Sequence, residues 1–89
     1  MNSIEKLIEV CKDYKSGILG IKEFQKRLET ILLPDELKNT LEKAQHNAFN
    51  KLEEIIFCYP EAEYKQYGDM VADDLIRAAI EAKKYLEKE

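Results

Sequence analysis

The sequence predicts an all-α protein, an up-down four-helix bundle with two shorter and two longer helices. Apolar residues recur three and four positions apart along most of the chain, which is typical of amphipathic helices. Only three glycines and two prolines occur, so the residues that many strands and tight turns would need are scarce. A chain of 89 residues has room for one core. Residues 1–89 are therefore expected to form a single helical domain.

The first helix is predicted from about Ser3 to Lys15. Asn2 and Glu5 have the spacing of a capping box at its start. Ser16-Gly17 ends it, because glycine accepts the left-handed conformation common just past a helix end. Its inward face consists of apolar residues at helical spacing, namely Ile4, Leu7, Ile8, Cys11 and Tyr14.

The second helix is predicted from Ile21 to about Leu32, with Gly20 as its N-cap and Glu23 at the third helical position. Leu19 and Phe24 have the spacing of a hydrophobic staple across that cap. Phe24, Leu28 and Ile31 are expected to face the core.

The third helix is predicted to begin at Pro34, since proline suits the first helical position and the following Asp35 and Glu36 complement the helix dipole. Its apolar face continues to Ile56 and is interrupted by Cys58-Tyr59-Pro60. Such a helix would be roughly 35 Å long at 1.5 Å per residue.

The fourth helix carries an apolar stripe and should reach about Lys88. Its start is left open between Glu61 and Asp69, because Gly68-Asp69 is either tolerated inside the helix or marks its beginning. The stripe consists of Tyr64, Tyr67, Val71, Leu75, Ala78, Ala79, Ala82 and Leu86.

The two cysteines, Cys11 and Cys58, fall where the helical pattern would bury them, and we interpret both as reduced core residues. One disulfide between them remains an alternative. The uncharged runs are too short to span a bilayer, and the N-terminus lacks the pattern of a secretory signal. We therefore expect a cytoplasmic protein with no membrane contact.

Catalytic chemistry has little support in the sequence. Glu42 and His46 lie four residues apart, but two ligands without a third do not make a persuasive metal site. Cys11 or Cys58 could serve as a nucleophile only beside an oriented base, and apolar cysteines are usually inert. We predict no enzyme, no cofactor and no metal; a small hydrolase or metal protein that uses His46 with Glu42 is the alternative.

A basic stripe in the first half of the chain is the one feature that suggests nucleic acid. Acidic residues interrupt it and few aromatic residues accompany it, so we predict no nucleic-acid binding. The stripe consists of Lys12, Lys15, Lys22, Lys26 and Arg27, and the interrupting acids are Asp13, Glu23 and Glu29.

The negative charge of the chain is concentrated between Glu53 and Asp74. Seven acidic residues and the single Lys65 give this segment a net charge of −6, whereas the remaining residues carry +2, in agreement with the total of −4. Phe57 and three tyrosines are interleaved with the acids. Carboxylates steer a cationic partner and tyrosine rings supply contact area, so the segment is typical of a protein-recognition surface.

We therefore predict that a basic protein binds here. The predicted partner-binding residues are Glu53, Glu54, Tyr59, Glu61, Glu63, Tyr64, Tyr67, Asp69 and Asp73. The competing interpretation is an ordinary solvated corner whose tyrosines cover the end of the core.

Leu7 to Leu28 resembles the opening of small helical immunity proteins that neutralise bacterial toxins of the colicin and contact-dependent inhibition kind. The resemblance lies in a short helix, the Ser16-Gly17 turn, and the segment ILGIKEF from Ile18 to Phe24 that leads into Lys26-Arg27-Leu28. It covers roughly a quarter of the chain. It implies a role in binding and blocking a basic toxin nuclease domain, and it implies no role for individual residues.

The function expected from the sequence is thus that of a protein-binding inhibitor, an immunity protein acting on a basic, nuclease-like toxin domain. The alternative is a self-associating structural or regulatory helical module without a toxin partner. We expect a monomer or a weak homodimer.

Overall fold

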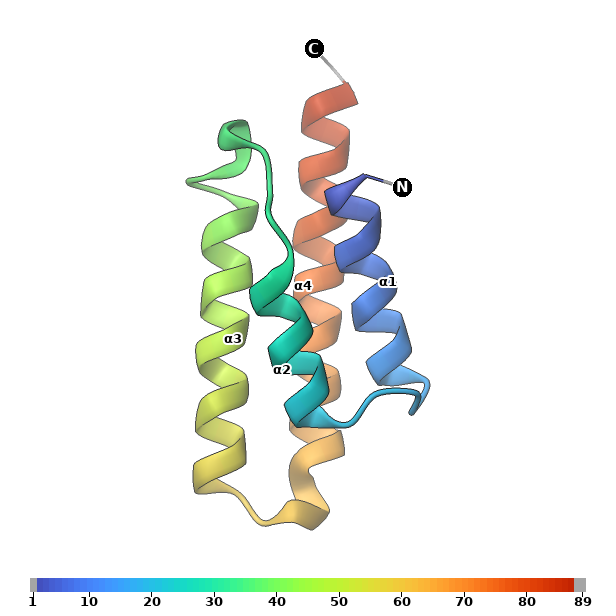
Figure 1. Ribbon diagram of the computed structural model, residues 1–89, viewed down its shortest axis with the longest axis vertical. Helices are drawn as coiled ribbons and strands as arrows, with labels where there is room; N and C mark the ends of the chain where they lie inside the picture. Colours follow the sequence, from blue (N-terminus) through green and yellow to red (C-terminus); the bar gives the residue numbers. More distant parts are fainter. Residues whose placement is uncertain (1, 88–89) are drawn as a thin grey trace.

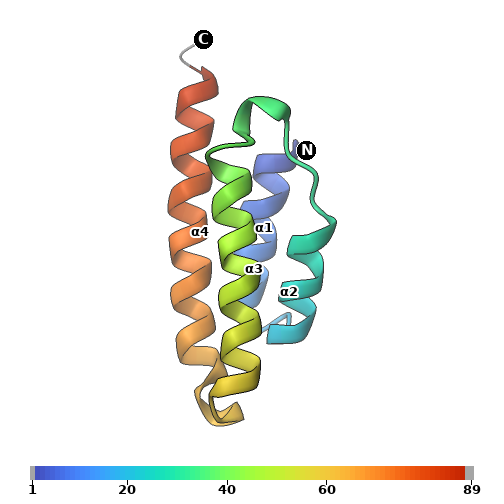
Figure 2. The same ribbon diagram turned by 90° about the vertical axis from the view of Figure 1, so that its left-hand side faces the viewer.

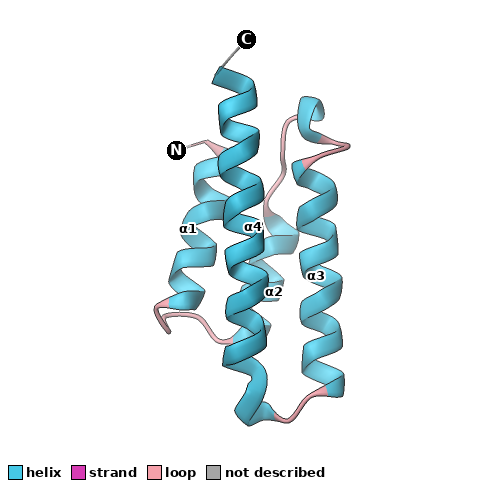
Figure 3. Cartoon of the chain, turned by 180° about the vertical axis from the view of Figure 1, so that it is seen from behind, coloured by secondary structure: helices cyan, strands magenta, loops and turns pink. Residues whose placement is uncertain are grey.

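The computed structural model describes residues 2–87, and every regular element in them is helical, which confirms the predicted all-α class (Figure 3). Four α-helices form the body of the molecule: α1 (Ser3–Lys15), α2 (Ile21–Thr30), α3 (Leu41–Cys58) and α4 (Tyr64–Glu87). Two single 3₁₀ turns, η1 (Asp35–Leu37) and η2 (Glu61–Glu63), precede α3 and α4.

The four helices lie side by side along the 44 Å length of the molecule (Figures 1 and 2). Helix α4 packs extensively against both α1 and α3, while α2 packs against α3 and α1. Figure 1 places η1 and the α3–α4 connection at opposite ends of the molecule. In residues 2–87 no helix is both long and apolar enough to cross a membrane.

Helix α1 has the predicted bounds and ends. Asn2 Oδ1 accepts a hydrogen bond of 2.9 Å from the backbone N–H of Glu5, which satisfies one of the free amides of the first turn. Gly17 has a φ of 88°, the left-handed conformation that the Ser16-Gly17 pair predicted.

Helix α2 begins at Ile21 after the extended Gly20, as predicted, but it ends at Thr30 rather than at Leu32. Ile31 is extended and buried, and Leu32 is 84% exposed. Gln45 of α3 donates its side-chain amide to the carbonyl oxygens of Leu28 and Ile31, which satisfies the end of α2 from outside the helix.

The prediction that the third helix begins at Pro34 is wrong. Pro34 is extended, the 3₁₀ turn η1 follows, and the chain breaks again at Thr40 before α3 begins at Leu41. Leu37 of η1 and Leu41 of α3 both point into the core, where each is 1% exposed. Helix α3 is therefore about 27 Å long at 1.5 Å per residue, shorter than predicted, although it ends at Cys58 as expected.

Helix α4 begins at Tyr64, between the two starts left open by the sequence, and passes through Gly68 without interruption. Gly68 is buried against the Tyr14 ring of α1, so the glycine marks a close contact rather than a helix end. The predicted end at Lys88 lies outside the described residues, and α4 is helical to Glu87.

The core is formed by the inward faces of all four helices. Phe24, Leu7, Leu28 and Leu52 are completely buried, and so is Cys11, as predicted. Cys58 is exposed, so its predicted burial is wrong: Ile55 is the last buried residue of α3, and Cys58 is the final residue of the helix, past the end of its buried face. Both thiols are free, which excludes the alternative disulfide.

Candidate protein-binding surface

The nine predicted partner-binding residues lie on three consecutive elements at one end of the molecule. Glu53 and Glu54 are on the last turns of α3, Tyr59 and η2 form the connection, and the others are on the first turns of α4 (bottom of Figure 1). We call the nine residues the acidic corner.

The three tyrosines of the acidic corner are half-buried against the core. The Tyr59 and Tyr67 rings stack with centroids 4.5 Å apart, and the Tyr64 hydroxyl donates a 2.7 Å hydrogen bond to the carbonyl oxygen of Ile56. These contacts close the end of the core, as the competing interpretation of this segment predicted. The exposed edges of the three tyrosine rings still border the acidic residues.

Asp69 and Asp73 face α1 and pair with lysines. Lys65 Nζ lies 2.8 Å from Asp69 Oδ1, and Lys15 pairs with Asp73. The hydrogen bond with Asp73, followed by the charge of that carboxylate, raises the pKa of Lys15. Asp73 therefore connects α4 to the C-terminal end of α1, a contact that no local sequence pattern indicated, whereas Asp69 pairs within α4.

Lys65 strengthens the same connection. Its Nζ donates hydrogen bonds of 2.7 and 2.9 Å to the carbonyl oxygens of Tyr14 and Lys15, and it lies 4.5 Å from the centroid of the Tyr14 ring. A lysine at this position satisfies carbonyls that a helix C-terminus leaves free and complements its dipole. Lys65, the only basic residue between Glu53 and Asp74, therefore already has its hydrogen-bond and ion-pair partners within the chain.

Glu53 and Glu54 point away from the core and are exposed. Glu53 accepts a hydrogen bond from Gln25 of α2, and Glu54 pairs with Lys51 at 3.3 Å. Exposed contacts of this kind contribute little to stability, so a partner can replace them at small cost.

Glu61 and Glu63 of η2 form no ion pair with any residue from 2 to 87. Four residues before Glu61 in the chain is Phe57, which the site prediction did not include and which is 77% exposed. On α3 it follows Glu53 and Glu54 by four and three residues, so the ring shares a helix face with both carboxylates. The interleaving of Phe57 with acids was visible in the sequence, but its exposure was not.

The acidic corner therefore consists of two parts with different roles. Tyr59, Tyr64, Tyr67, Asp69 and Asp73 mainly support the fold, whereas the remaining acids have only exposed contacts or no ion pair within residues 2–87. We call these acids together with Phe57 the outer acidic surface; it consists of Glu53, Glu54, Phe57, Glu61 and Glu63. It can attract cationic groups and bury one apolar side chain.

The other sequence candidates lie away from this end. Glu42 and His46 are both exposed on α3, and within residues 2–87 no three metal-ligating side chains come together. Burial, and to a lesser extent the charge of Asp73, raises the pKa of the Cys11 thiol to about 12. A buried thiol of that pKa stays protonated and is a poor nucleophile.

Comparison of the chain with protein-family models, curated proteins and solved structures gave no match.

Proposed function

We propose that this protein is a protein-binding inhibitor, an immunity protein that binds and neutralises a basic, nuclease-like toxin domain. In this proposal an up-down four-helix bundle with two shorter and two longer helices is the rigid scaffold. The observation that carries the proposal is the outer acidic surface, in which a phenylalanine that is 77% exposed shares a helix face with Glu53 and Glu54 and is followed in the chain by Glu61 and Glu63.

Electrostatics supports a basic partner. Glu61 and Glu63 have no cation beside them among the described residues, and the contacts of Glu53 and Glu54 are exposed. Carboxylates gathered in this way accelerate the encounter with a cationic surface and repel acidic proteins. A nuclease domain presents such a cationic surface because it must bind phosphates.

Phe57 supports a protein rather than a small cation as the partner. A ring that is 77% exposed presents a large apolar area to water. Interfaces concentrate their binding energy in a few side chains that fill pockets within a polar rim. An exposed Phe57 with Glu53 and Glu54 on the same helix face fits that description, and we infer a partner with an apolar recess flanked by arginine or lysine.

Inhibition requires only that the partner's cationic surface be covered. We therefore propose 1:1 binding in the cytoplasm without catalysis, cofactor or metal. Self-association through the tyrosines is the weaker alternative, since Tyr59, Tyr64 and Tyr67 already make contacts within the chain.

The test begins with a pull-down from the native host, in which a salt step elutes proteins held by charge. A basic polypeptide recovered in this way is then titrated calorimetrically at two salt concentrations with the Glu61→Lys/Glu63→Lys variant. We expect at least a 100-fold loss of affinity and a weaker dependence on salt, because two attractive charges become repulsive.

The matched control is Glu36→Lys/Glu81→Lys, which makes the same change in net charge at two exposed positions outside the corner. It should change the affinity less than threefold, and circular dichroism should show both variants folded. Equal losses in the two variants, or the recovery of no basic partner, would reject the proposed function.

A further inference from the structure

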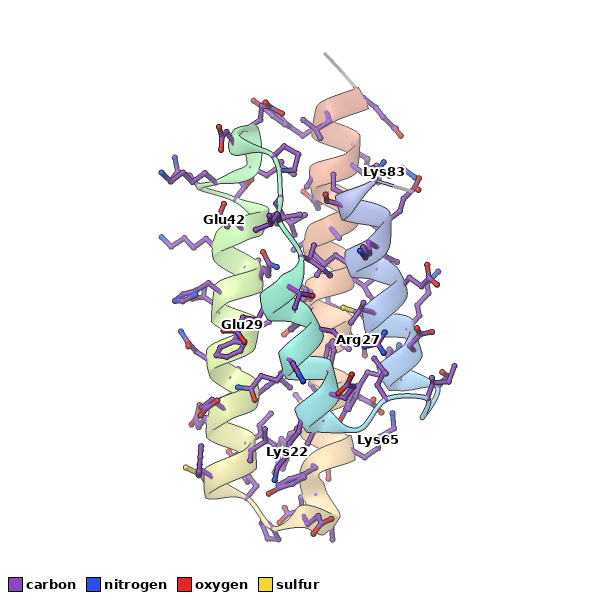
Figure 4. The ribbon with its side chains drawn as sticks, in the orientation of Figure 1. Lys22, Arg27, Glu29, Glu42, Lys65 and Lys83 are labelled. Carbon is purple, nitrogen blue, oxygen red and sulfur yellow. The ribbon has the colours of Figure 1, made fainter. Side chains whose placement is uncertain are left out.

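A groove of about 830 Å³ lies between α3 and the segment that leads into it from α2. It exists because α2 ends at Thr30 and the chain continues extended to Pro34. Its apolar lining includes Leu28, Ile31, Leu33 and Phe49. Figure 4 labels Glu29 on α2 and Glu42 on α3, which both line it.

Leu32 also lines this groove, and at 84% exposure it is the most exposed large apolar side chain in residues 2–87. Its neighbours Ile31 and Leu33 are buried and half-buried, so the extended backbone directs this one side chain outward. Removing a leucine side chain from water is favourable, so the binding of a partner that covers Leu32 would be stabilised.

The charges around the groove are of both signs. Glu29, Asp35, Glu42, Lys38 and Lys43 line it, and none of them forms an ion pair with another described residue. A surface that carries both signs of charge can pair with an identical surface, because a twofold axis places most residues of one copy opposite different residues of the other. The outer acidic surface, which carries one sign of charge, would instead repel its own copy.

We propose that two copies of this chain pair through the groove about a twofold axis, with Leu32 of each copy seated in the groove of the other. Carboxylates and lysines then meet across the rim. The contact buries one exposed leucine of each copy, so we expect weak dimerisation with a dissociation constant on the order of 10 µM to 1 mM. Because the acidic corner lies at the other end of the molecule, it stays free in the dimer, and the inference does not depend on the proposed function.

The test is sedimentation velocity from about 10 µM to 1 mM protein, in a reducing buffer so that the exposed Cys58 cannot cross-link the copies. The average mass of the wild type should rise towards that of a dimer. Leu32→Ala should raise the dissociation constant at least tenfold. The matched control Phe57→Ala, which removes an exposed apolar side chain at the other end, should change it less than twofold.

A second measurement locates the contact. In a ¹⁵N-labelled concentration series the amide signals of Leu32, Leu33 and Glu42 should shift with dimerisation, while those of Glu61 and Glu63 should not. A chain that stays monomeric to 1 mM, or a dimer unaffected by Leu32→Ala, would overturn the groove dimer. Loss of the dimer in Phe57→Ala alone would place self-association at the acidic corner and would count against both proposals, whereas absence of a basic partner leaves the dimer result unchanged.

Discussion

At the scale of single residues, Tyr14 of α1 connects its own helix with α2 and α4. Its ring stacks on Phe24 of α2 with centroids 4.6 Å apart, and its hydroxyl donates a 3.1 Å hydrogen bond to the carbonyl oxygen of Tyr64. Gly68 of α4 lies directly against the same ring. The absence of a side chain at Gly68 is what allows α4 to approach α1 here.

Gly68→Ala should therefore destabilise the protein even though alanine favours helices. The new Cβ would lie 2.6 Å from Cζ of the buried Tyr14 ring, so the ring or α4 must move. Overpacking of this kind costs about 1–3 kcal/mol, more than the gain of at most about 1 kcal/mol in helix propensity. Urea unfolding monitored by circular dichroism measures the difference.

A double-mutant cycle assigns this cost to Tyr14. In a Tyr14→Leu background the outer part of the ring is gone, so adding Gly68→Ala should cost less than about 0.5 kcal/mol. A cost that is the same in both backgrounds would show that the clash with Tyr14 is not the cause.

At the scale of elements, the sequence predicts helix faces well and helix ends unevenly. α1 has both predicted ends because Asn2 and Gly17, which flank the helix, are local signals in the sequence. α2 ends early because its last carbonyls are satisfied by Gln45 from a different helix. Pro34 introduces a 3₁₀ turn instead of α3, and the chain breaks at Thr40, where neither glycine nor proline marks the interruption in the sequence.

Gln45→Leu tests the role of that contact at the end of α2. Gln45 is 8% exposed, and its amide donates hydrogen bonds of 2.6 and 2.9 Å to the Leu28 and Ile31 carbonyls. Leucine leaves both acceptors without this donor, which should cost about 1–3 kcal/mol of unfolding free energy. Gln66→Leu, at an exposed position on α4, is the control and should change stability by less than about 0.5 kcal/mol.

Hydrogen exchange distinguishes a local effect from a global one. Amides in the last turn of α2 should exchange faster in Gln45→Leu than those of α1. An unfolding free energy equal to that of the wild type would mean that water replaces the side-chain amide without loss.

At the scale of the whole molecule, the sequence locates the charge asymmetry. It does not show which of the acids pair within the fold and which remain free for a partner. The acids from Glu53 to Asp73 do share one end of the molecule. Which of them are neutralised depends on Lys15, which lies more than fifty residues from Asp73 in the chain. Likewise, the exposure of Phe57 depends on how α3 is rotated against α4, which periodicity fixes only to within a residue.

The whole fold should lose stability in alkaline solution, beginning with Cys11. Burial raises the pKa of this thiol from its usual 9.0 to about 12, so the folded protein keeps a proton that the unfolded chain releases above pH 9. The stabilisation is complete below pH 9 and is lost as the pH rises towards 12. Burial likewise raises the pKa of Tyr14 to about 12, but from 10.0. The stability that this hydroxyl contributes therefore begins to be lost one pH unit higher than that of Cys11.

Unfolding free energies measured in urea from pH 7.5 to 10 separate the two groups. For the wild type we expect a constant value to about pH 8.5 and then a decline of at most about 1.4 kcal/mol per pH unit from Cys11. Cys11→Ala is less stable throughout because it leaves a small cavity, but its free energy should stay level to about pH 9.5. Parallel curves for the two proteins would show that another group causes the decline, whereas a level curve only for Cys11→Ala would identify this thiol as the group that limits the alkaline stability of the fold.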